Sequence, residues 1–285
     1  MSRIAYVNGR YLRHSEAAVS IEDRGFQFAD GVYEVCEVRG GRLVDERRHL
    51  ARLERSLREL RIGLPMPLHA LGIVLRETVR RNRVRDGIVY LQVTRGAAPR
   101  DFPFPAGDTP PTVVVTARSN DPRKLSSLAG QGIAVVTVPD IRWQRVDIKT
   151  VALLPNVLAK QAARDRGARE AWLVDPRGCV TEGASSNAWI LTGEGALVTR
   201  PLGTDILPGI TRSVVLEVVA AQGLTLQERP FTVEEAYAAR EAFVTSASQI
   251  VMPVVRIDEH SIGTGKPGPI AQALRRDFYR HAEVA

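Results

Sequence analysis

The chain has 285 residues and a net charge of +7, with 44% hydrophobic and 25% charged residues. This length predicts about two domains, and the composition excludes a disordered or low-complexity chain. Two cysteines are too few for a disulfide-stabilised scaffold, and no apolar run reaches the roughly 18 residues of a membrane span.

The excess positive charge is distributed along the chain. The densest groups of arginines, in 47–61 and 76–85, fall at helical spacing beside apolar residues, which is typical of solvated helix faces. Neither interleaved aromatic residues nor a binding motif accompanies them, so we predict no nucleic-acid partner. The amino terminus lacks a signal-peptide pattern, and we expect a cytoplasmic protein without a membrane partner.

The first part of the chain predicts hairpins followed by helices. The pairs Asn8-Gly9 and Gly40-Gly41 favour tight turns between alternating segments. Leucines at helical spacing predict a helix over 45–61, with Asp45 as its cap, and a second helix is expected over 67–83. The segment GIVYLQVTRG predicts a buried strand.

The second part mixes short strands with helices. Helical segments are expected over 156–166, 210–222, 233–240 and 269–281, without regular alternation of strand and helix. We therefore predict an α+β fold. Its parts are a small amino-terminal domain over 1–118, a polar linker over 119–128 and a larger domain over 129–285.

Lysine is rare in this chain, since only four of the 39 basic residues are lysines. Unlike arginine, lysine can lose its proton and attack a carbonyl. Lys124, Lys160 and Lys266 lie in polar or loop segments and read as surface residues. Lys149 stands in DIKTVALLPN, between apolar segments. Its position alone favours a structural ion pair, with amine chemistry as the second interpretation.

Two familiar motifs are excluded. The segment GTGKPG over 263–268 matches GxGxxG, but no strand precedes it and Pro267 interrupts it, so a dinucleotide site is not predicted. It does not match the phosphate-binding P-loop pattern either. The five histidines show no ligand spacing, so no metal site is predicted.

Three further segments have features of a cofactor site. Glu182 in VTEGASSN is followed by small residues that permit close approach of a bound group. In LPGITR a helix is expected to begin at Ile210 and Thr211, where backbone amides suit a phosphate. The segment VTSASQI places small hydroxyl residues at a strand end. Taken singly, each has an ordinary structural explanation.

In combination these segments resemble a known enzyme family. The stretches EDRGFQFADGVYEV, HLARL, YLQVTRGAAPR, DIRWQRVDIKTVALLPNVLAKQ, VTEGASSNAWI, LPGITR and FVTSASQIVMPV follow one another from Glu22 to Pro253. In this order they resemble the fold-type IV pyridoxal-phosphate enzymes, and among these the D-amino acid transaminases. The resemblance implies a small α/β domain followed by a larger β-rich pseudo-barrel domain.

The resemblance also implies a role for each matching residue. Lys149 would form the Schiff base with pyridoxal 5'-phosphate and carry the proton during amino transfer to pyruvate or 2-oxoglutarate. Glu182 would pair with the pyridine nitrogen. The remaining positions would bind the phosphate (Arg52, Ile210, Thr211, Ser246 and Ala247) or the substrate (Tyr33 and Arg100). The α-carboxylate would bind Arg100 of a neighbouring subunit, so a homodimer with its active site at the subunit interface is expected.

One departure from the family pattern concerns the substrate. D-alanine-type members have a histidine two residues after the carboxylate-binding arginine, whereas Asp101 and Phe102 follow Arg100 here. The loss of this donor should weaken carboxylate binding, and Asp101 is expected to compete for Arg100. The alternatives are an (R)-amine transaminase, a branched-chain amino acid transaminase and an aminodeoxychorismate lyase.

Overall fold

The computed structural model describes residues 3–105, 107 and 109–284 and divides the chain into two compact units. Unit 1 comprises Met1–Pro122, Ile148–Ala152 and Glu283–Ala285, and unit 2 comprises Arg123–Asp147 and Leu153–Ala282. Each unit has a sheet and helices that pack on it, which confirms the α+β prediction. The predicted boundaries at 118 and 129 stay a prediction, and helix α4 (Pro122–Gln131) occupies part of the expected linker.

Unit 1 is built on an antiparallel sheet. Within its described residues six strands pair in the order β2-β1-β6-β5-β3-β4. The strands are β1 (Ile4–Val7), β2 (Arg10–Arg13), β3 (Gly31–Arg39), β4 (Arg42–Leu43), β5 (Gly87–Thr94) and β6 (Thr112–Ser119). The expected turns join β1 to β2 and β3 to β4, because both residues of each turn pair adopt positive φ.

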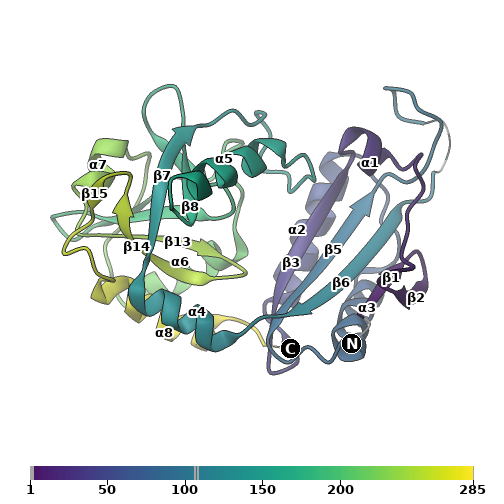
Figure 1. Cartoon of the computed structure of the whole chain (residues 1–285), viewed down its shortest axis with the longest axis horizontal. Coiled ribbons are helices and arrows are strands. Elements are labelled where there is room, and N and C mark those ends of the chain that lie inside the picture. The colour runs from purple at the N-terminus through teal and green to yellow at the C-terminus, as the bar shows by residue number, and fades with distance from the viewer. Residues whose placement is uncertain (1–2, 106, 108, 285) are drawn as a thin grey trace. The chain divides into compact units, whose positions relative to one another are not determined.

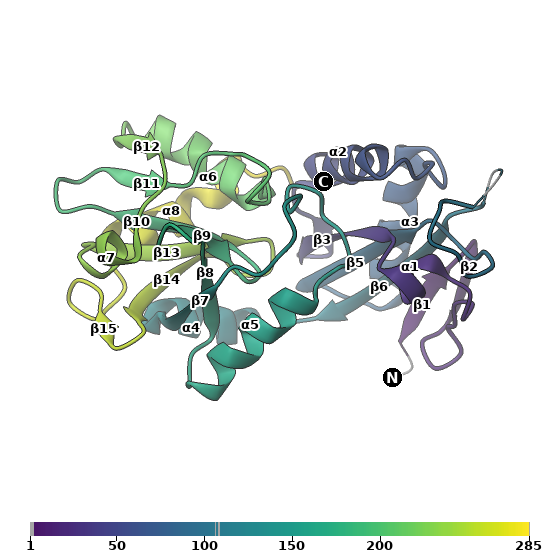
Figure 2. The same ribbon diagram turned by 90° about the horizontal axis from the view of Figure 1, so that it is seen from above.

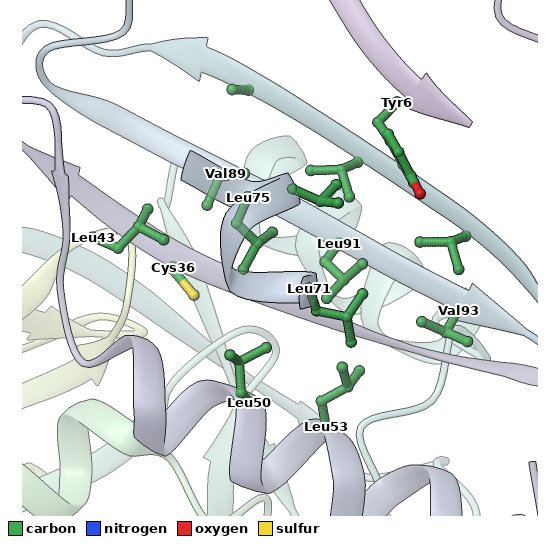
Figure 3. Packing of buried hydrophobic residues seen from close by; sticks show 14 of the residues in the cluster. Tyr6, Cys36, Leu43, Leu50, Leu53, Leu71, Leu75, Val89, Leu91 and Val93 are labelled. Atoms are coloured by element: carbon green, nitrogen blue, oxygen red, sulfur yellow. The ribbon is translucent and has the colours of Figure 1, made fainter. Parts of the chain in front are cut away.

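Two long helices cover one face of this sheet. Helices α2 (Glu46–Glu59) and α3 (Leu68–Arg81) lie over the same side of the strands (Figure 2), while the short helix α1 (Arg24–Phe28) precedes β3. Their leucines, among them Leu50, Leu53 and Leu71, form a buried core with alternate residues of β3, β5 and β6 (Figure 3). The leucine spacing therefore placed α2 correctly.

The start of α2 differs from the prediction. Asp45 precedes the helix, but it adopts φ 54° and its side chain makes no cap hydrogen bond. Its carboxylate instead accepts a hydrogen bond from the backbone N–H of Glu283, at 3.0 Å. Asp45 thus takes the predicted N-cap position, but its side-chain acceptor is used by the carboxyl-terminal residues, which return to unit 1.

Unit 2 contains a mixed sheet that curls (Figure 1). In its described part the strand order is β12-β11-β10-β13-β14-β7-β8-β9, with β15 beside β14. The strands are β7 (Ile133–Pro139), β8 (Glu170–Val174), β9 (Val180–Gly183), β10 (Asn187–Leu191), β11 (Leu197–Thr199), β12 (Leu226–Glu228), β13 (Glu241–Ser246), β14 (Ile250–Ile257) and β15 (His260–Ser261). Strand β9 is last in this order, yet a short turn joins it to β10, so the sheet curls back as the predicted pseudo-barrel requires.

Helices pack on the strands of unit 2. Helix α5 (Leu154–Asp165) contacts β7 and β8, while α6 (Ile210–Ala221) packs beside α8 (Pro269–His281) and against β13. Helix α7 (Val233–Tyr237) begins with a capping box formed by Thr232 and Glu235. In the part of the chain described, no helix is long and apolar enough to cross a membrane.

Candidate active site

Lys149 belongs to unit 1 and has a fixed backbone. Its N–H donates to Ser56 Oγ on α2 at 3.3 Å, and its carbonyl accepts from the N–H of Tyr33 on β3 at 3.0 Å. The next residue, Thr150, forms a β-bridge with Val32. The segment thus extends the sheet at β3, which sets the position from which the lysine side chain projects.

The Lys149 side chain lies against an aromatic ring. Its Nζ is 4.2 Å from the centroid of the Tyr33 ring, and that ring stacks on Tyr90 at 5.6 Å between centroids. No ion pair involves Lys149 among the residues that the structure describes, so the structural ion pair favoured by its position is not observed. The amine therefore lies over the face of the Tyr33 ring, at a distance typical of a cation–π contact.

Arg52 is part of a buried charged group on the helix-covered side of β3. Its Nε and Nη2 donate to the two carboxylate oxygens of Glu34 at 2.7 and 2.8 Å, and His49 Nδ1 lies 2.7 Å from Glu34 Oε2. Burial raises the pKa of Glu34, but the charge and hydrogen bonds of Arg52 and the contact with His49 outweigh burial and lower that pKa to about 2. Glu34 is therefore ionised and holds the guanidinium in one plane.

Arg100 lies in an exposed loop. Its guanidinium carbon is 4.6 Å from the centroid of the Phe28 ring, and Phe102 packs on the same ring with 5.6 Å between centroids. Of the residues described, none forms an ion pair with Arg100. The Asp101 carboxylate accepts the N–H of Phe102 at 2.8 Å instead, so the expected competition of Asp101 for Arg100 is absent.

Glu182 belongs to unit 2 and is buried on β9. Its Oε1 accepts from Arg142 Nη1, and its Oε2 accepts from Asn187 Nδ2 at 2.9 Å and from the N–H of Leu207 at 3.1 Å. Arg142 is held in turn by Asp140, at 2.7 and 2.9 Å. Burial lowers the pKa of Arg142, but hydrogen bonds and charge from Asp140 and Glu182 outweigh burial and raise that pKa, so the cation is retained. The charged donor favours the ionised form of Glu182.

Asn187 connects Glu182 to the start of α6. Its amide donates to Glu182 and also to the carbonyl of Leu207, at 2.9 Å. A side chain at Gly209 would meet Asn187 Oδ1 at 2.0 Å, so only glycine fits at this N-cap. Helix α6 has no side-chain cap hydrogen bond, and its first-turn amides point towards whatever precedes the helix.

The remaining predicted phosphate-binding residues lie at the start of α6 and at the end of β13, the strand that pairs with β10. Ile210 and Thr211 form the first turn of α6, as predicted, and Thr211 is buried. Ser246 ends β13 and Ala247 begins the turn to β14, where the N–H of Gln249 donates to the carbonyl of Ser246 at 3.2 Å. Asn187 pairs in register with Thr245, directly before Ser246.

Each unit brings together part of the predicted set. In unit 1 Lys149 contacts Tyr33, and Ser56, which accepts the Lys149 N–H, is one helical turn from Arg52. In unit 2 Asn187 joins Glu182 to the loop before α6. Sequence reasoning missed the partners that hold these groups, namely Glu34, His49, Ser56, Asp140, Arg142 and Asn187. All of these except Ser56 stand inside the quoted stretches, but no spacing rule pairs them with their distant partners.

The chain belongs to the amino-transferase class IV family, whose model matches residues 31–257. It is 43% identical over 268 residues to a D-alanine aminotransferase of Bacillus licheniformis, covering 94% of this chain and 93% of the relative. A D-alanine aminotransferase of Staphylococcus haemolyticus is 40% identical over 279 residues, covering 98% and 97%. The matches extend over nearly the full length, so the predicted family is confirmed.

Solved structures share the fold. A branched-chain amino acid aminotransferase of Escherichia coli superposes with a TM-score of 0.90 at 22% identity, over 98% of this chain and 94% of that chain. A branched-chain aminotransferase of the archaeon Thermoproteus uzoniensis, solved with norvaline, gives a TM-score of 0.86 at 26% identity over 100% and 99% of the two chains. The predicted fold-type IV architecture is thereby confirmed.

Proposed function

We propose that this chain is a pyridoxal-phosphate-dependent transaminase that transfers the amino group of a D-amino acid to a 2-oxo acid such as pyruvate or 2-oxoglutarate. The family match and the two D-alanine aminotransferase relatives support the reaction and the donor. The observation that carries the proposal is Lys149, a lysine with a fixed backbone whose amine lies on the Tyr33 ring. When bound, pyridoxal phosphate supplies an aldehyde that condenses with amines and a ring that accepts electrons.

The described residues fit this cofactor. Glu182 is buried and stabilised in its ionised form by Arg142, which is the state needed to keep a pyridine nitrogen protonated. The first turn of α6, with Gly209 as a side-chain-free N-cap, suits a phosphate group. We assign the ring nitrogen to Glu182 and the phosphate to Ile210, Thr211, the Ser246–Ala247 segment and Arg52.

Arg52 would bind the phosphate from a fixed orientation. Glu34 grips its guanidinium with two hydrogen bonds, and His49 contacts the same carboxylate. A guanidinium held in one plane by two parallel hydrogen bonds keeps a fixed position and its positive charge, which suits the binding of a phosphate. The buried residues Glu34, His49 and Arg52 would therefore hold the phosphate-binding guanidinium in place as well as stabilise the fold.

Lys149 would hold the cofactor covalently and move the proton at the substrate Cα. A positioned amine contributes to such transfers by general acid and base catalysis. Tyr33 lies against this amine and would face the substrate, while Arg100 would bind the α-carboxylate through two parallel hydrogen bonds. The side on which Lys149 delivers the proton would determine the D configuration.

A homodimer is part of the proposal, with Arg100 serving the site of the neighbouring subunit. Helix α5 presents Leu154, Val157 and Leu158 to solvent, with 53–68% of each residue exposed. Their spacing of three and four residues places them on one face of the helix. An apolar face of this kind is typical of a protein–protein contact, and a second copy of the chain is its proposed occupant.

The replacement Lys149→Ala tests the assignment. Turnover should fall by at least about a thousandfold, because the amine that moves the proton is lost. The Lys266→Ala variant is the control, since Lys266 lies in a loop before α8 and has no assigned role. Circular dichroism and thermal unfolding should show both variants folded. Undiminished transamination by Lys149→Ala would exclude this lysine as the catalytic residue.

A further inference from the structure

Arg24 is a buried charged side chain that the proposed chemistry does not use. Only 3% of this residue is exposed, on the short helix α1. Its Nε donates to Asp30 Oδ2 at 2.9 Å, while its Nη1 and Nη2 donate to the carbonyls of Asp101 and Phe102 at 2.6 and 3.2 Å. The guanidinium thus holds the two residues that directly follow Arg100.

Asp30 fixes Arg24 together with a second buried arginine. Arg95 donates to both carboxylate oxygens of Asp30, at 2.7 and 3.0 Å, and also to the carbonyls of Leu60 and Arg61. Buried arginines need such fixed acceptors, because an unpaired buried charge is costly. The two arginines share one carboxylate but donate to different backbone segments. Arg95 also packs on the Phe104 ring, with 3.6 Å from its guanidinium carbon to the ring centroid, whereas Arg24 is the one of the two that donates to the carbonyls directly after Arg100.

The Phe28 ring joins Arg24 to Arg100. It lies 4.7 Å from the guanidinium carbon of Arg24 and 4.6 Å from that of Arg100, measured to the ring centroid. Phe102 packs on the same ring, with 5.6 Å between centroids. The exposed Arg100 is therefore oriented by a ring and a loop backbone that both contact Arg24.

We propose that Arg24 is a positioning residue that aims the Arg100 guanidinium at the substrate carboxylate, acting through Phe28 and through the carbonyls of Asp101 and Phe102. The proposal rests on the proposed function, in which Arg100 binds the α-carboxylate. The substrate class concerned is amino and 2-oxo acids. Aromatic packing and the two carbonyl contacts of Arg24 hold the Arg100 loop in this chain.

The test compares matched variants of the holoenzyme. Arg24→Met removes the clamp on residues 101 and 102, whereas Arg95→Met removes an equally buried arginine from the same carboxylate. Arg24→Met should raise KM for pyruvate, and the dissociation constant of acetate measured by calorimetry, by about tenfold or more, because small displacements of a binding group have large effects. The value of kcat per bound cofactor should change less. Arg95→Met should lower the melting temperature without a comparable change in KM.

Two further variants keep the test decisive if Arg24→Met does not fold. Phe28→Leu removes the ring but preserves apolar bulk, and it should raise the same KM. The double variant Phe28→Leu with Arg100→Ala should be no worse than Arg100→Ala alone, because residues that act through one another are not additive.

The outcomes separate the inference from the proposed function. If Arg100→Ala leaves KM unchanged, another cation binds the carboxylate, and the positioning role of Arg24 is overturned, whereas the transaminase proposal is tested separately by Lys149→Ala. If Arg100→Ala raises KM but Arg24→Met and Phe28→Leu do not, only the positioning role of Arg24 is overturned. Equal KM changes in Arg24→Met and Arg95→Met would indicate a nonspecific loss of structure around Asp30 and would also contradict the positioning role of Arg24.

Discussion

The ionisation of Glu34 makes the stability of the folded protein depend on pH, because Glu34 is the buried partner of Arg52. Its pKa is about 2 in the folded protein, below the ordinary value of 4.5. A lowered folded-state pKa stabilises the protein fully above pH 4.5, and this contribution is lost as the pH falls from 4.5 to 2. The contribution is on the order of 3 kcal/mol.

The variant Glu34→Gln tests this pH dependence. At pH 7 it should be less stable by roughly 3–5 kcal/mol, since Arg52 loses its buried partner. The difference from the unsubstituted protein in denaturant unfolding should shrink as the pH falls from about 5 towards 2. Glu77→Gln is the control, because Glu77 pairs with Arg80 and Arg81 at the surface and such pairs contribute little. A difference that is constant with pH would show that Glu34 is not ionised in the fold.

Single residues show which part of the site could be predicted. Lys149, Glu182 and the start of α6 stand out in the sequence because a rare lysine, a glutamate followed by small residues and a Pro-Gly helix start are local signals. The contacts that hold them are not local. Arg142 lies 40 residues from Glu182, and Glu34 lies 18 residues from Arg52. Such pairs follow from the packing of the units, which no local pattern encodes.

Helix α6 is the element whose position matters most for the proposed phosphate site. Its N-cap, Gly209, has no room for a side chain, because a Cβ would meet Asn187 Oδ1 at 2.0 Å. Gly209→Ala should therefore displace either the first turn of α6 or Asn187, which holds Glu182. Affinity for pyridoxal phosphate, measured by fluorescence titration, should fall by about tenfold.

Gly193→Ala, in the turn between β10 and β11, is the control for Gly209→Ala. A Cβ at Gly193 meets nothing within 4 Å, so the affinity for pyridoxal phosphate should be unchanged. Equal affinity in both variants would argue against a phosphate at the start of α6.

The predicted elements agree with the structure where the pattern is periodic. The helices expected over 156–166, 210–222 and 269–281 correspond to α5, α6 and α8 within a few residues. The pairing of strands was less accessible, since β7 lies parallel to both β14 and β8, which are distant in sequence. The side-chain partner of the N-cap residue Asp45 was inaccessible for a similar reason, because Glu283 lies 238 residues away.

At the scale of the whole molecule, the proposed homodimer gives a separate prediction. Leu158→Arg places a charge on the apolar face of α5 and should shift the protein towards monomers in analytical ultracentrifugation. Ile73→Arg, on the exposed face of α3, is the control and should keep the dimer. A Leu158→Arg protein that stays dimeric would place the subunit contact elsewhere.

The family and its fold were accessible from sequence because many short segments occur in the family's order along the whole chain. The preferred substrate was not, because Asp101 and Phe102 depart from the family pattern at the carboxylate-binding loop. The structure shows that Asp101 bonds to the backbone of Phe102 and leaves Arg100 on the Phe28 ring. We therefore expect the carboxylate-binding function of Arg100 to be retained, and with it a preference for amino acids over simple amines.

The visible absorption spectrum of the purified holoenzyme, before and after separate additions of D-alanine and L-alanine, tests the central claim most directly. We expect the yellow band of the lysine-bound cofactor to be converted by D-alanine and to persist with L-alanine. Conversion by L-alanine alone, or a band that neither isomer changes, would contradict D-amino acid transamination. A protein that gains no band with added pyridoxal phosphate would contradict the assignment of Lys149 as well.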